Sequence, residues 1–144
     1  MTELRTEIEI NAPAELVWSA LLDFERYPKW NPFIREISGT PSVGAILNVF
    51  IKPEGGMGAK LAPIIVAFDE NRKFAWKGKF GVNGVFDGQH EFIIEALDVG
   101  KVNFVQREEF SGLLVPVLWP MLRKNTERGF NEMNRSLKSL VEGN

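Results

Sequence analysis

One long amphipathic helix near the end of the chain constrains the fold more than any other feature of the sequence. From Val115 to Glu142, apolar residues recur at spacings of three and four, which is the period of one helix face. The predicted stripe consists of Val117, Leu118, Met121, Leu122, Phe130, Met133, Leu137, Leu140 and Val141. Such a helix has about 28 residues and is about 40 Å long. In this chain only a broad sheet can cover it.

The middle of this stripe departs from the pattern. Asn125, Thr126 and Gly129 stand where large apolar side chains are expected. We therefore expect the helix to bury its two ends and to cover a cavity at its centre. Pro116 and Pro120 lie four residues apart near its start, and they predict either a kink or a proline-containing first turn.

The rest of the chain alternates between apolar and polar residues, with short turns, which is typical of antiparallel strands. We expect a strand at 4–10, a helix from Pro13 to about Leu22 and a short helical turn near 25–27. Six further strands are predicted at 34–39, 45–52, 60–68, 72–80, 85–97 and 101–112. The prediction is one α+β domain, residues 1–144, in which a seven-stranded curved antiparallel sheet (β-α-α-β6-α) wraps around the C-terminal helix.

Composition excludes several classes of function. The net charge of −2 gives no basic surface for nucleic acid, and the longest apolar run, Leu113–Leu122, is too short for an integral membrane segment. The chain has no cysteine and one histidine, so we expect neither a metal site nor a cofactor. The acidic, alternating N-terminus is not a signal peptide, and we expect a cytoplasmic protein.

Four motifs resemble the START-like (SRPBCC) superfamily, and specifically its polyketide cyclase/dehydrase-type members. They are Ile10-Asn11-Ala12-Pro13 with Val17-Trp18, the segment Tyr27–Phe33, the segment Gln106–Gly112, and Asn134–Lys138. The match covers essentially the whole chain. The resemblance implies the Bet v 1-like helix-grip fold, in which the sheet and the long helix enclose a tunnel for an apolar ligand.

Strand parity assigns the residues that face the helix, because alternate residues of a strand share a side. The predicted wall is mostly aromatic, with a few polar groups, which is typical of sites for small molecules. The predicted ligand-binding residues are Phe74, Trp76, Phe80, Phe92, Phe104, Gln106, Phe110, Asn125 and Gly129.

Glu108 and His90 are the titratable residues on that face. A carboxyl group in an apolar wall has a raised pKa, and a neighbouring imidazole can share its proton, so the pair is a candidate for acid/base catalysis. The alternative is structural: Glu108 meets a donor at the rim of the sheet, and His90 is a hydrogen-bonded core residue.

Three functions follow from these patterns. The first is binding or transport of a small hydrophobic molecule, such as a lipid, a polyketide or an aromatic metabolite. The second is a polyketide cyclase/dehydratase that uses Glu108 and His90. The third is a regulatory or chaperone-interaction module that uses the convex face, where Lys73, Lys77 and Lys79 lie. The Gly55–Gly58 loop is either a plain hairpin turn or a gate at the mouth of the tunnel. The sequence does not identify the ligand or the oligomeric state.

Overall fold

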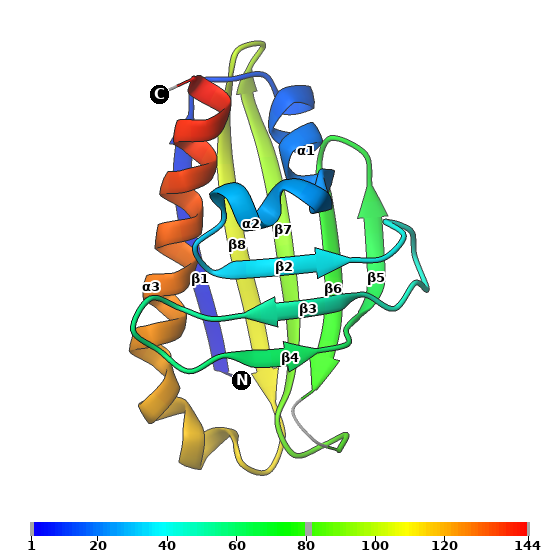
Figure 1. Ribbon diagram of the computed structural model, residues 1–144, viewed down its shortest axis with the longest axis vertical. Helices are drawn as coiled ribbons and strands as arrows, with labels where there is room; N and C mark the ends of the chain where they lie inside the picture. Colours follow the sequence, from blue (N-terminus) through cyan, green and yellow to red (C-terminus); the bar gives the residue numbers. More distant parts are fainter. Residues whose placement is uncertain (1, 80–81, 144) are drawn as a thin grey trace.

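The computed structural model describes residues 2–79 and 82–143. Five strands form one antiparallel sheet in the order β1-β8-β7-β6-β5. Their bounds are β1 Thr2–Ile10, β5 Ile64–Asp69, β6 Lys73–Lys79, β7 Asp87–Asp98 and β8 Lys101–Ser111. A second, three-stranded sheet contains β2 Ile34–Ser38, β3 Asn48–Ile51 and β4 Ala59–Leu61. Its strands cross the long strands of the first sheet (Figure 1).

The helices lie between these strands and at the end of the chain. They are α1 Ala14–Leu22, the 3₁₀ turn η1 Phe24–Arg26, α2 Tyr27–Trp30 and α3 Val115–Glu142. The predicted bounds of the long helix are confirmed. Gly143 ends α3 in the left-handed conformation, with φ 78°, which glycine adopts without steric cost.

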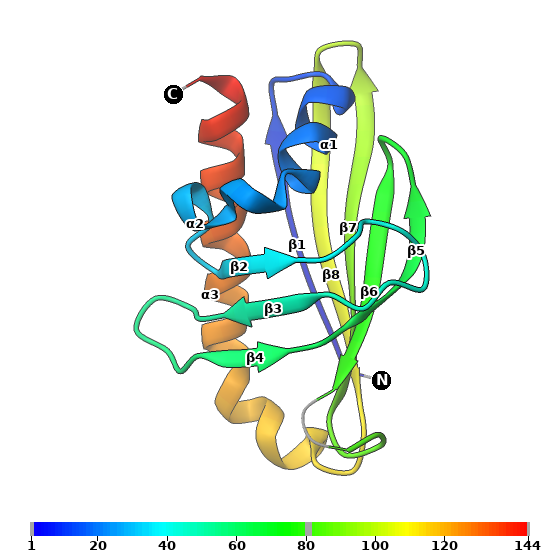
Figure 2. The same cartoon turned by 45° about the vertical axis from the view of Figure 1, so that its right-hand side comes forward.

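The start of α3 combines both expected effects of its prolines. Pro116 lies in the first turn, where its missing N–H needs no partner, whereas Pro120 lies inside the helix and removes one hydrogen bond. Figure 2 shows that the first turns of α3, coloured gold, bend away from the axis of the rest. Among the described residues, no helix combines the length and the apolar content needed to span a membrane.

The prediction of seven strands is corrected to eight in two sheets, within the same fold. The strand expected at 60–68 is interrupted at Ala62–Pro63, because Pro63 has no N–H to donate to a neighbouring strand. The Pro63 carbonyl instead accepts a hydrogen bond from the Leu47 amide at 2.8 Å, and the Ile65 amide donates to the Ala45 carbonyl at 2.9 Å. These bonds connect the two sheets.

The core lies between the concave face of the larger sheet and the C-terminal half of α3. Phe130, Met133 and Leu137 are fully buried there. The prediction that Val117 and Met121 belong to the same buried stripe is wrong, because their side chains are 65% and 74% exposed. The first two turns of α3 are apolar on all sides, so the spacing does not identify the side that packs on the sheet.

Candidate functional site

A chain of polar side chains crosses the aromatic interior and joins four elements. His90 of β7 lies 2.9 Å from Gln106 of β8, measured from Nε2 to Oε1. The amide nitrogen of Gln106 donates to Asn134 Oδ1 at 2.7 Å and to the Phe130 carbonyl at 3.2 Å, both on α3. Asn134 Nδ2 donates to Thr6 Oγ1 of β1 at 3.0 Å. All of these side chains are buried, so this polar chain satisfies the hydrogen-bonding capacity of polar groups that the core encloses.

The donor-to-acceptor direction of the hydrogen bonds in this polar chain fixes the tautomer of His90. Because the amide nitrogen of Gln106 is used toward α3, its Oε1 must accept, and His90 Nε2 therefore carries the proton. His90 Nδ1 is left with a lone pair and lies 3.5 Å from Glu108 Oε1. A protonated Glu108 can donate toward this nitrogen, whereas a carboxylate would face a lone pair.

The surroundings of His90 keep its ring neutral. The ring stacks on Phe92 and Phe130, with centroid distances of 4.1 and 4.7 Å, and only 1% of the residue is exposed. Burial lowers the pKa of His90 to about 3, although the hydrogen bond to Gln106 and the charge of Glu91 act in the opposite direction. His90 and Glu108 are therefore not an ion pair at neutral pH.

Glu108 lies at the boundary between this core and solvent. Its side chain is 17% exposed, and burial raises its pKa to about 8, so it is mostly a neutral acid at pH 7. Gly88 on β7 makes room for the carboxyl group, because a Cβ atom there would collide with Glu108 Oε2. The interpretation of Glu108 and His90 as catalytic stays a prediction.

The aromatic residues of the predicted wall lie on the sheet face that packs against the helices. Phe74, Trp76, Phe92 and Phe104 are all buried in the hydrophobic core. Phe110 is also buried and contacts Trp119 of α3, with ring centroids 4.4 Å apart. The wall therefore continues past Glu108 to the first turns of α3. Contact of these residues with a ligand stays a prediction.

The two predicted residues on α3 do not face an open space. Gly129 packs against the Phe33 ring so closely that an added Cβ atom would collide with it. Asn125 is partly exposed, and its Oδ1 accepts a hydrogen bond from Arg128 Nη2 at 2.9 Å. The expected cavity under the centre of α3 is therefore corrected: Phe33 fills the place beside Gly129. Phe80 lies outside the described residues.

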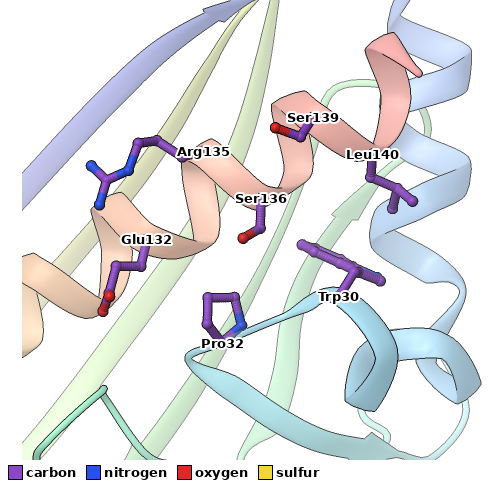
Figure 3. A pocket seen from close by; sticks show the side chains of 7 residues that line it. All are labelled: Trp30, Pro32, Glu132, Arg135, Ser136, Ser139 and Leu140. Atoms are coloured by element: carbon purple, nitrogen blue, oxygen red, sulfur yellow. The ribbon is translucent and has the colours of Figure 1, made fainter. Parts of the chain in front are cut away.

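Pockets open at the surface of the part of the chain that the structure describes. One of about 540 Å³, between α2 and the C-terminal half of α3, is lined by Trp30, Pro32, Glu132, Arg135, Ser136, Ser139 and Leu140 (Figure 3). The second, of about 420 Å³, lies beside η1 and the smaller sheet, and the third, of about 690 Å³, lies beside β4, β5 and β6. None of these three is lined by a residue predicted for the ligand site.

Sequence reasoning missed two members of the polar chain, Thr6 and Asn134. The sequence pattern around each of the two residues indicated that its side chain is buried. Thr6 shares the buried side of its strand with Leu4, and Asn134 lies four residues after Phe130 on the packed side of the helix. Their contact joins residues at opposite ends of the sequence, and no local pattern identifies it. Within residues 2–79 and 82–143, no three acidic or histidine side chains gather as metal ligands.

The convex face of the sheet carries a network of charges. Arg107 bonds Glu91 at 2.5 Å and Glu3 at 2.9 Å, and Lys73 lies 3.0 Å from Glu91. Lys73, which was predicted as part of a partner surface, is thus paired within the sheet. The third functional hypothesis, with Lys73, Lys77 and Lys79 as candidate contacts, stays a prediction.

Comparisons with known proteins agree with this architecture. Among solved structures, a START superfamily protein from Mycobacterium smegmatis is 21% identical, with a TM-score of 0.78 over 98% of this chain and 97% of that one. The Zhui aromatase/cyclase from Streptomyces sp. R1128 is 17% identical, with a TM-score of 0.79 over 98% and 93%. A point mutant of norcoclaurine synthase from Thalictrum flavum is 14% identical, with a TM-score of 0.75 over 99% and 94%.

At these identities the solved structures establish the fold alone. No curated protein matches the sequence. The model of one protein family, described as polyketide cyclase / dehydrase and lipid transport, matches residues 1–142. The chain, with its helix-grip fold, therefore belongs to the polyketide cyclase/dehydrase and lipid transport family.

Proposed function

We propose that the protein binds a small, mostly hydrophobic molecule beside Glu108, between β8 and the first turns of α3. The observation that carries this proposal is a neutral carboxylic acid in an aromatic wall that leads to the surface. Phe110 and Trp119 continue the wall, and the side chain of Glu108 keeps some exposure. Apolar walls with one or two polar groups are typical of sites that orient small ligands.

The chemistry of Glu108 indicates which molecules fit. A protonated carboxyl group can donate one hydrogen bond and accept another, so it matches a hydroxyl or a carbonyl group on an otherwise apolar ligand. A ligand carboxylate fits poorly, because burying its charge in an aromatic wall without a cationic partner costs free energy. The ligand class is therefore a neutral, oxygen-bearing apolar molecule. The family description, which includes lipid transport, supports this class.

The experiment compares two probes that differ by one hydroxyl group, 1-naphthol and naphthalene. We expect saturable binding of both, with 1-naphthol bound about 3–10-fold more tightly through one hydrogen bond. Glu108→Leu should remove this preference and keep naphthalene binding. Glu109→Leu is the matched control, because Glu109 is the next residue and bonds Arg107 on the convex face. Absence of saturable binding to the unmodified protein would refute the proposal.

A second candidate, cyclisation of a polyketone, is favoured by the pKa of Glu108, which burial raises to about 8, close to neutral pH. The likeness in fold to the Zhui aromatase/cyclase supports testing it. Since burial lowers the pKa of His90 to about 3, the imidazole is a poor base, and we assign proton transfer to Glu108 and its orientation to His90. Glu108→Gln should lower turnover about 100-fold or more, and Glu109→Gln should not. Equal turnover in both variants would remove this candidate.

A further inference from the structure

The first two turns of α3 carry apolar side chains on both sides of the helix. On the inner side, Leu118 and Trp119 pack against the core. On the outer side, Val117 and Met121 lie one turn apart and are 65% and 74% exposed. A helix at the surface of a globular protein normally places polar residues outward. Packing within the fold therefore does not explain why these apolar residues face solvent.

A neighbouring loop adds further apolar side chains to the same end of the molecule. Leu113 and Val82 are 83% and 67% exposed. The Leu113 amide donates to the Gly84 carbonyl and the Leu114 amide donates to the Val85 carbonyl, each at 2.9 Å, so the two segments lie side by side (Figure 2). We name this surface the apolar end; it consists of Val82, Leu113, Leu114, Val117, Met121 and Leu122.

The start of α3 carries basic residues beside the apolar end. Residues 112–126 contain Arg123 and Lys124 and no acidic residue. In the neighbouring loop, the carboxylate of Asp87 accepts a hydrogen bond from the Gly84 amide at 3.0 Å. The whole chain has a net charge of −2, so this cationic character is local. Lys124 lies on the same side of α3 as Val117 and Met121, at helical spacing, and its long aliphatic stem can lie along apolar surface.

We propose that the apolar end docks onto an anionic lipid surface. The outward apolar side chains enter the boundary between headgroups and acyl chains, and Arg123 and Lys124 bind lipid phosphates. A second copy of the chain fits this surface less well, because a symmetric contact would bring the same cations of both copies together. This proposal does not rest on a ligand beside Glu108, since it uses the exposed side of α3 and the loop residues beside it.

The test is flotation of the full chain with vesicles of phosphatidylcholine alone and with added phosphatidylglycerol. We expect binding to the anionic vesicles, weakening at high salt. The double variant Val117→Ser/Met121→Ser should lower binding about 10-fold or more, and so should Arg123→Glu/Lys124→Glu. The matched control is Leu97→Ser/Val99→Ser, which changes two exposed apolar residues, one near the end of β7 and one in the β7–β8 turn, at the opposite end of the sheet. It should bind as the unmodified protein does.

Each alternative outcome overturns the proposal. Failure of the unmodified protein to float with anionic vesicles would do so, and so would equal loss of binding in the control. A third result would also overturn it. In that result the unmodified protein is a dimer by light scattering after gel filtration, the Val117→Ser/Met121→Ser variant is a monomer, and the protein does not bind lipid. The substituted residues are exposed, so we expect the variants to fold, and their melting temperatures check this directly.

Discussion

The two halves of α3 differ in how they meet the rest of the protein. The C-terminal half is sealed: Phe130, Met133 and Leu137 are fully buried, and Phe33 fills the space beside Gly129. The N-terminal half is bent at Pro120 and leaves apolar side chains in solvent. The comparison teaches that one continuous helix combines a part that packs against the core with a part whose apolar side chains are exposed. The polar chain through Gln106 contacts the sealed half, at Phe130 and Asn134.

The largest expected effect tests the sealed half. Phe130→Ala should lower the free energy of unfolding by about 3–5 kcal/mol, because it leaves a cavity in a packed interior. Val117→Ala, in the other half, should change it by no more than about 0.5 kcal/mol. Urea unfolding of both variants measures the difference. Similar losses in the two would mean that the halves are not distinct.

The second prediction concerns pH and Glu108, which lies at the boundary between the core and solvent. Burial raises the pKa of Glu108 from 4.5 to about 8, so between these values the folded state holds a proton that the unfolded state has lost. Its contribution to stability therefore falls as pH rises. His90, lowered from 6.5 to about 3, has the opposite effect at lower pH. The two effects cancel between pH 4.5 and pH 6.5, and we expect a net loss of about 2 kcal/mol from pH 6.5 to pH 8.

Unfolding measured across this pH range checks the prediction. Glu108→Gln should abolish the fall, since a neutral amide has no proton to lose, and the variant should be more stable than the unmodified protein at pH 8. Glu109→Gln serves as the control. A fall of the same size in Glu108→Gln would show that another group causes it.

A smaller effect is expected at the centre of the helix. Gly129→Ala forces the Phe33 ring to shift, which costs about 1–3 kcal/mol, and it gains about 1 kcal/mol in helix propensity. We expect a net loss of about 1 kcal/mol in thermal or urea unfolding. Ser136→Ala on the same helix provides a control without the clash. A stabilised Gly129→Ala variant would mean that space remains beside Phe33.

The smallest effect concerns the loop between β3 and β4. Arg128 of α3 donates to the Glu54 carbonyl and to Asn125, and so connects this loop to the helix. Arg128→Ala should speed amide hydrogen exchange at residues 53–58 and lower stability by less than about 1 kcal/mol, because the contact is exposed. Lys124→Ala, one turn earlier, should leave that exchange unchanged. Unchanged exchange in Arg128→Ala would show that the bond does not hold the loop.

The parts of this fold that were predicted correctly depend on local periodicity. The bounds of α3 follow from the proline in its first turn and the glycine after its last, and the aromatic faces of β7 and β8 follow from strand parity. The interruption at Pro63 could also have been predicted, because proline is rare inside a central strand.

The errors have physical reasons. A helix turn that is apolar on all sides has no preferred inner face, so the sequence could not show that Val117 and Met121 point outward. The contact of Phe33 with Gly129 depends on how two distant segments pack, and so does the bond between Thr6 and Asn134. For the same reason the sequence could not show that Phe33 fills the space beside Gly129.

The pairing of β1 with β8 has a consequence for synthesis. Thr2 lies opposite Phe110, so β1 leaves the ribosome long before its partner strand β8 has been translated. Closing so long a loop costs conformational entropy, and proteins rich in such distant contacts fold slowly. During translation β1 is therefore an unpaired strand, and we expect it to be the segment that chaperones protect in the nascent chain.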